Sequence, residues 1–121
     1  MVDFDRRDYD NLSMKIAHPN VDFDRLREIG WSLWDPIGLS GVTEGWRGEP
    51  YEDEYDRYLY NAAQMLKNNC TVDEVADYLF LIQSQYMQIG PKQIDGTIRA
   101  KLIRVALAIS DDSQIWKNPE N

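Results

Sequence analysis

Cysteine and histidine are almost missing from this chain of 121 residues, which contains one of each, Cys70 and His18. A single cysteine excludes a disulfide within the chain and the multi-cysteine zinc sites that stabilise many small domains. His18 directly precedes Pro19, and no serine or cysteine stands beside it as a nucleophile that it could activate. We therefore expect no catalytic residue, no metal site and no cofactor, with Cys70 as a partly buried structural thiol.

Long apolar runs and the common ligand-binding motifs are missing as well. No stretch approaches the roughly 18 apolar residues of a membrane-spanning helix, and the N-terminus lacks the apolar stretch of a secretory signal. The glycines between residues 38 and 48 have neither the spacing nor the lysine of a phosphate-binding loop. The chain also has no Glu-x-x-His pair and no EF-hand loop. These absences predict a soluble, cytoplasmic protein that does not contact membranes.

Positive charge is in short supply. Thirteen Lys and Arg stand against 21 Asp and Glu, which leaves a net charge of −8. Nonspecific binding to nucleic acid or to anionic membranes depends on cationic side chains, so this balance argues against both. Arg99, Lys101 and Arg104 form the one basic group on a predicted helix, and they are too few for a DNA-binding surface. We expect no direct contact with nucleic acid.

Helical periodicity is clear in the second half of the chain. Apolar residues at helical spacing predict an amphipathic helix over residues 51–68. Thr71 and Glu74 then have the spacing of a capping box, in which each side chain binds a backbone N–H of the other residue. The helix that they begin should end at Gly90-Pro91, because glycine accepts the left-handed conformation and proline blocks continuation.

A further helix is expected at about residues 95–110, and its apolar arc is unusually broad. Ile98, Leu102, Val105 and Ile109 form its main stripe, and three more apolar residues widen it. A helix of this kind is usually packed against several others, so we predict that it is the central helix of the core. Residues 111–121 are predicted to form a polar tail.

The first half of the chain has a weaker pattern. Apolar spacing predicts a helix over about 21–34 and a shorter one around Tyr9 to Ile16, whereas residues 35–50 resemble an extended loop. No strand pattern competes anywhere. We therefore predict a single domain over residues 1–121 that is all-α and compact, with four or five helices.

The segment that contains Trp31, Trp34, Asp35 and Pro36 allows two interpretations. The tryptophans are three residues apart and share a face if the helix reaches them, and Asp35 before a proline can cap a new turn. The structural interpretation is a rigid corner at the end of a helix. The functional interpretation is a corner that recognises a ligand or partner, and both remain open at this point.

The same corner carries a family resemblance. The Trp34-Asp-Pro-Ile-Gly38 sequence is followed by Asp53-Glu-Tyr-Asp-Arg-Tyr58 and Val75-Ala-Asp-Tyr-Leu79. Together these segments resemble small bacterial helical proteins with a WDP(F/I)G signature, a domain family of unknown function. The resemblance covers about residues 22–90. It implies an α-helical fold and a cytoplasmic location, and it carries over no catalytic residues.

Acidic and aromatic residues alternate between Glu49 and Tyr60. Five acids fall within eight positions, on a chain whose second half is almost neutral. Exposed aromatic side chains can anchor a partner while carboxylates steer a basic one, although acids at a helix start can also simply match the helix dipole. The residues that we predict to bind a partner are Trp46, Glu49, Tyr51, Glu52, Asp53, Glu54, Asp56 and Tyr58.

These features favour a noncatalytic, acidic interaction module. The most concrete form is an inhibitor or immunity protein for a basic bacterial toxin or nuclease, because a cleft that holds phosphates is cationic and attracts an acidic surface. The alternative is a small-molecule-binding or enzymatic domain that uses the loop from Trp31 to Trp46 as a pocket wall.

Overall fold

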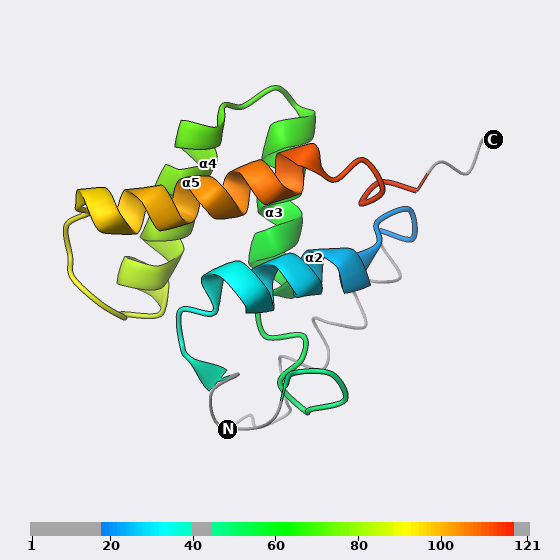
Figure 1. Cartoon of the computed structure of the whole chain (residues 1–121), viewed down its shortest axis with the longest axis horizontal. Helices are drawn as coiled ribbons and strands as arrows, with labels where there is room; N and C mark the ends of the chain where they lie inside the picture. Colours follow the sequence, from blue (N-terminus) through cyan, green and yellow to red (C-terminus); the bar gives the residue numbers. More distant parts are fainter. Residues whose placement is uncertain (1–17, 40–44, 118–121) are drawn as a thin grey trace, which may run out of the picture.

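The computed structural model describes residues 18–39 and 45–117, and the protein is all-α, as predicted (Figure 1). The predicted short helix around Tyr9 to Ile16 lies outside the described residues. Within them there is no strand, and one isolated β-bridge joins Val21 to Trp116. The helical elements are α2 (Phe23–Ile29), η1 (Gly30–Trp34), α3 (Asp56–Lys67), α4 (Val72–Leu81), η3 (Ile82–Tyr86) and α5 (Gly96–Asp111), where η denotes a π-helical segment.

The helix starts are set by side chains close in sequence. Thr71 and Glu74 form the predicted capping box of α4, with the Glu74 N–H donating to Thr71 Oγ1 at 3.1 Å and the Thr71 N–H donating to Glu74 Oε1 at 2.8 Å. Asp95 accepts the N–H of Ile98 at the start of α5. Asp22 caps α2 in the same way. Each cap satisfies backbone donors that have no partner inside the helix.

The helix expected over 51–68 is shorter than predicted, because residues 51–55 form turns and α3 begins only at Asp56. Glu52 points back across these turns and accepts the N–H of Gly48 at 3.0 Å. Glu52, Asp53 and Glu54 therefore lie in the turns before the helix, and Asp56 is the acidic residue of its first turn.

The helices expected over 21–34 and from 71 onward are present, but each widens into a π-helical turn before it ends, and the second ends at Tyr86, before the expected Gly90-Pro91. α2 continues as η1 and α4 continues as η3. Gly30 lies at the first of these transitions, where a Cβ atom would stand 2.6 Å from Leu59 Cδ1. The absence of a side chain at residue 30 therefore lets α2 and η1 approach α3 closely.

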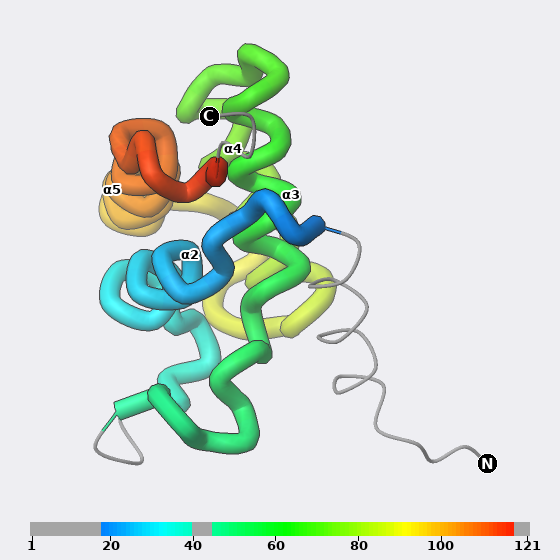
Figure 2. Tube along the Cα trace, turned by 90° about the vertical axis from the view of Figure 1, so that its right-hand side faces the viewer, coloured from blue at the N-terminus to red at the C-terminus, as the bar shows by residue number. Residues whose placement is uncertain are grey.

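The core lies between two layers, with α2 and α5 on one side and α3 and α4 on the other (Figures 1 and 2). On α5, Leu102, Val105 and Ile109 are buried as predicted, whereas Ile98 is half-buried and packs against the edge of the core. The prediction that α5 supplies the central apolar face is confirmed for three of these four residues.

The described ends of the chain meet beside α2 and α5. The Asp22 N–H donates to Ile115 O at 2.8 Å, and the Lys117 N–H donates to Asn20 O at 2.6 Å. Ile115 is fully buried and Trp116 is half-buried under the Lys67 ammonium, which lies 4.2 Å from the ring centre. Residues 112–117, which we expected in a polar tail, are thus part of the packed structure.

Candidate functional site

A buried arginine organises the region where we predicted a partner surface. Arg27 on α2 donates from Nε and Nη2 to both carboxylate oxygens of Asp56, at 2.9 and 2.8 Å. Its Nη1 donates to Glu52 Oε1 at 2.8 Å. Only 5% of Arg27 and 2% of Asp56 are exposed. The contacts join α2 to the start of α3 and to the turns before it.

The electrostatics of this cluster keep Arg27 charged. Burial lowers the pKa of a guanidinium, but the hydrogen bond and charge of Asp56, with the charges of Glu52 and Asp53, outweigh it. The pKa of Arg27 therefore lies above its usual value. The guanidinium and the Asp56 carboxylate form an interior ion pair. The sequence did not predict it, because Arg25 and Arg27 both lie in a helical stretch with charged neighbours and nothing there marks Arg27 as the buried one.

The buried cluster changes what the predicted site residues can do. Trp46, Asp53 and Asp56 are buried, and Glu52 is held by Arg27. The remaining members of the predicted set are half-buried: Glu49, Tyr51, Glu54 and Tyr58. The expectation of a continuous exposed surface from Glu49 to Tyr58 is therefore corrected, because the fold turns its central carboxylates inward toward Arg27.

An aromatic cluster fills the space beside these carboxylates. Trp31 packs on Tyr55 at 4.6 Å between ring centres and on Tyr51 at 5.4 Å, and its ring stacks on that of Trp46 at 6.4 Å. The Trp31 indole N–H donates to the Glu52 backbone oxygen at 3.1 Å. Trp31 is buried and thus anchors the turns internally, so it does not line an open pocket.

The corner at Asp35 is held by tyrosine and backbone hydrogen bonds. Asp35 Oδ1 accepts the N–H groups of Gly38 and Leu39, both at 3.1 Å, as well as the hydroxyl of Tyr55 at 2.9 Å. Burial, with a smaller contribution from the Asp35 carboxylate, raises the pKa of Tyr55 well above its usual range, although the N–H of Ile37 opposes the shift. These contacts support the structural interpretation of the corner.

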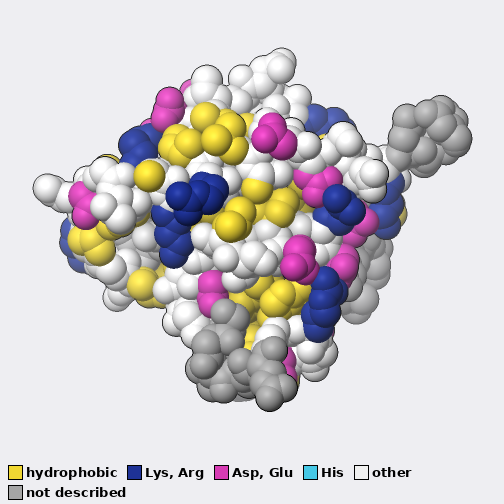
Figure 3. Space-filling view, viewed as in Figure 1, with side chains coloured by type: hydrophobic (Ala, Val, Ile, Leu, Met, Phe, Trp, Pro, Cys, Tyr) yellow, Lys and Arg dark blue, Asp and Glu magenta, His cyan; other side chains and the backbone are white. Residues whose placement is uncertain are grey.

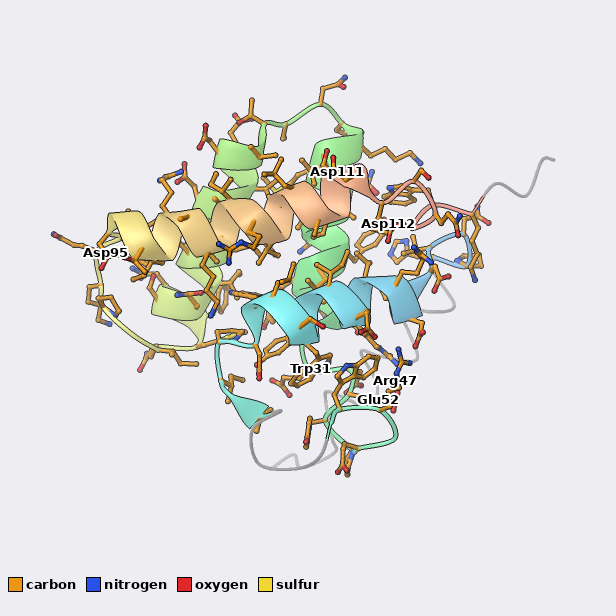
Figure 4. The ribbon with its side chains drawn as sticks, viewed as in Figure 1. Trp31, Arg47, Glu52, Asp95, Asp111 and Asp112 are labelled. Atoms are coloured by element: carbon orange, nitrogen blue, oxygen red, sulfur yellow. The ribbon has the colours of Figure 1, made fainter. Side chains whose placement is uncertain are left out.

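The surface beside the aromatic cluster carries an open pocket of about 360 Å³, which we call the Trp46 pocket. Its lining comes from α2 and from the turns that follow the loop: Glu28, Gly45, Trp46, Arg47 and Glu49. In the view of Figure 4, Arg47 and Glu52 both lie below α2. Among the described residues that line this pocket, Trp46 is the only aromatic one, and Trp31 is not part of the lining.

Arg47 lies across the Trp46 ring at the edge of this pocket. Its guanidinium carbon is 4.5 Å from the ring centre, and its nitrogens reach Asp24 Oδ1 at 3.1 Å and Glu28 Oε1 at 2.6 Å. All three charged side chains are more than half exposed. In Figure 3 a basic side chain stands between acidic ones on this face, just below α2.

Two other groups considered from the sequence have internal partners. Arg99 on α5 binds Asp73 and Asp77 on α4. His18 stacks on Tyr60 with 4.0 Å between ring centres. Among residues 18–39 and 45–117, no group of three or more histidine, cysteine or acidic side chains is placed to hold a metal ion. Within the same ranges, none of the helices has both the length and the apolar character needed to cross a membrane.

Comparison with models of known protein families, with curated proteins and with solved structures finds no match for this chain. The resemblance to proteins with a WDP(F/I)G signature stays a prediction from sequence.

Proposed function

We propose that this protein is a noncatalytic interaction module that binds a basic protein through an acidic face, formed by α2 and the turns at residues 45–52. The observation that carries the proposal is the position of the carboxylates around the Trp46 pocket. Asp24 and Glu28 are exposed on α2, and Glu49 lines the same opening. This face keeps Glu49 and Glu52 of the predicted cluster and adds two acids that the sequence pattern did not single out.

The chemistry of this face suits a cationic protein partner. The net charge of −8 attracts a basic molecule over long range, and local carboxylates orient it at short range. Tryptophan and arginine are also enriched in the centres of protein interfaces. The lining of the Trp46 pocket is largely charged, whereas small-molecule sites are mostly apolar, so a protein fits it better than a small apolar ligand does.

We infer that the partner is a basic bacterial toxin or nuclease and that binding inhibits it. A nuclease holds phosphates in a cationic cleft, and an acidic surface placed across that cleft blocks substrate entry. Such complexes gain speed of association from electrostatic attraction, which salt weakens. The predicted absence of catalytic chemistry in this protein is part of the same proposal.

The test uses a panel of purified basic bacterial nucleases and toxins, with association kinetics measured at low and high ionic strength. The informative variant combines Asp24→Asn, Glu28→Gln and Glu49→Gln. Its matched control removes the same charge from α4 by combining Asp73→Asn, Glu74→Gln and Asp77→Asn. We expect the first variant to slow association with the bound partner by about tenfold and to flatten the salt dependence, with a much smaller effect from the control.

Two results would overturn the proposal. One is that no basic protein of the panel binds more tightly than a neutral protein of similar size. The other is that the two triple variants slow association equally, which would assign the effect to overall charge and leave the face around Trp46 without a special role.

A further inference from the structure

We propose that the Trp46 pocket is a guanidinium-binding subsite, and that Arg47 occupies within the chain the place that an arginine of the partner takes on binding. This subsite rests on the proposed function, because it names the chemical group that the acidic face recognises. The proposal comes from the groups that surround the Arg47 guanidinium, from their exposure and from the open space beside them.

The surroundings of Arg47 combine the two kinds of group that recognise a guanidinium. One is an aromatic face, since the Arg47 carbon lies 4.5 Å from the centre of the Trp46 ring. The other is a pair of carboxylates, Asp24 and Glu28, at 3.1 and 2.6 Å from the guanidinium nitrogens. A planar, delocalised cation with several donors fits this arrangement better than the compact ammonium of lysine does.

Arg47 is held loosely enough to be exchanged. Its side chain is 61% exposed, and those of Asp24 and Glu28 are 64% and 55% exposed. Ion pairs between exposed side chains contribute little stability, because water solvates the separated charges well. Arg27 is the contrasting case, with a side chain that is 6% exposed and bound to Asp56 through two hydrogen bonds.

The space next to Arg47 supplies the entrance. The open pocket of about 360 Å³ adjoins Arg47 and is lined by Glu28, Trp46 and Glu49. An incoming arginine therefore meets the carboxylate that Arg47 now uses, the same indole and a further carboxylate. As the incoming arginine enters, the Arg47 side chain turns out into solvent, and the charge of Arg47 no longer competes for Glu28.

The inference predicts that removing Arg47 strengthens the binding of arginine. The probes are a hexa-arginine peptide and a hexa-lysine peptide, titrated against the full chain while the indole N–H resonance of Trp46 is followed by NMR. A Trp46→Phe variant assigns that resonance among the four tryptophans. We expect Arg47→Gln to tighten hexa-arginine binding by about fivefold or more, as the lost internal pairs no longer compete.

A matched control separates competition from charge. Arg104→Gln removes the same charge from an exposed position on α5, away from the residues that line the pocket. We expect it to tighten binding by less than about twofold, because screened charges act weakly over distance. Glu28→Gln should weaken hexa-arginine binding, and hexa-lysine should bind less tightly than hexa-arginine to every form of the protein.

The subsite is overturned if Arg47→Gln and Arg104→Gln tighten binding equally, or if the peptide binds without moving the Trp46 resonance. It is also overturned if hexa-lysine binds as tightly as hexa-arginine. None of these outcomes overturns the proposed function, provided that the binding of a basic protein still depends on the acidic face. The reverse result, arginine binding at Trp46 with no basic protein partner in the panel, would overturn the proposed function and keep the subsite.

Discussion

Arg27 and Arg47 carry the same charged group, and their burial makes their roles opposite. Arg27 is inside the protein and is bound to Asp56 and Glu52, so its departure would leave charges without water or counterions. Arg47 is on the surface, where solvent can replace Asp24 and Glu28 at little cost. The first arginine stabilises the fold, and the second is the one that we propose gives way to an arginine of a partner.

The first prediction concerns the buried pair. Arg27→Met or Asp56→Asn should lower the free energy of unfolding by about 3–5 kcal/mol, because each change leaves the other group without its partner in the interior. Urea denaturation measures this loss. Arg25→Met is the control, since Arg25 binds Asp112 with 43% of its side chain exposed and should cost less than about 1 kcal/mol. Equal losses at residues 25 and 27 would contradict the prediction.

The second prediction concerns pH. Because the pKa of Tyr55 is raised in the folded protein, its neutral form is favoured there, and this contribution is fully present below the unfolded pKa of about 10. Above that pH the unfolded chain releases a proton that the folded chain keeps, so stability should fall by up to about 1.4 kcal/mol per pH unit. Urea denaturation between about pH 8 and pH 11 measures this slope, because that interval spans the range in which tyrosine ordinarily titrates.

Tyr55→Phe should remove this part of the alkaline slope, and it should also lower stability at neutral pH by about 1 kcal/mol through the lost hydrogen bonds to Asp35 and Ile37. Tyr86→Phe is the matched control, because Tyr86 is 73% exposed. An alkaline slope that is the same in Tyr55→Phe and in the unaltered protein would refute the assignment.

At the scale of helices, the two π-helical segments join one layer of the fold to the other. η1 extends α2 and η3 extends α4, and the Trp34 indole N–H of η1 donates to Gln83 Oε1 of η3 at 2.9 Å. Such widened turns are rare in proteins and occur mostly as single turns within α-helices. Here the widening places a buried tryptophan within reach of a polar group from the other layer.

The third prediction tests the close approach of these layers. Gly30→Ala should destabilise the protein by about 1–3 kcal/mol, although alanine is the better helix former, because its Cβ would meet the Leu59 side chain at 2.6 Å. Gly96→Ala is the control, since nothing lies within 4 Å of a Cβ at that position of α5. Thermal unfolding of both variants measures the difference, and equal melting temperatures would rule out the close contact.

At the scale of the whole molecule, α5 and the ends of the described chain hold the layers together. α5 supplies Leu102, Val105 and Ile109 to the core, and the chain that follows it brings the fully buried Ile115 against the start of α2. The acidic face lies on the other side of α2, where Arg27 and Trp31 fix the turns that carry Trp46. The core thus supports the proposed binding face and contributes Trp46 to the pocket on it.

The fourth prediction concerns this core. Leu102→Ala should lower the free energy of unfolding by about 2–5 kcal/mol, because it leaves a cavity where Leu102 is fully buried. Leu107→Ala makes the same chemical change on the same helix at a position that is 44% exposed, and should cost much less. Circular dichroism during urea denaturation measures both. A Leu102→Ala variant as stable as the unaltered protein would contradict the central role of α5.

Local features of the sequence predicted the helices well. The capping box at Thr71, the stripe on α5 and the helix that ends at Trp34 all depend on residues a few positions apart, so their physical causes are visible in the sequence. The same holds for the burial of Leu59, which lies on the apolar face of α3, whereas the equally buried Tyr55 lies just before that helix.

Tertiary structure alone decided which charged side chains are buried and which are exposed to solvent. Arg27 and Asp56 are 29 positions apart, and Arg47 meets Asp24 at a distance of 23 positions, so no local pattern reveals either pair. The sequence by itself determined an acidic, helical chain with a cluster of carboxylates. The fold turned Asp53 and Asp56 inward and joined Glu28 to Trp46 at an open pocket, because burial and ion pairing depend on distances in space.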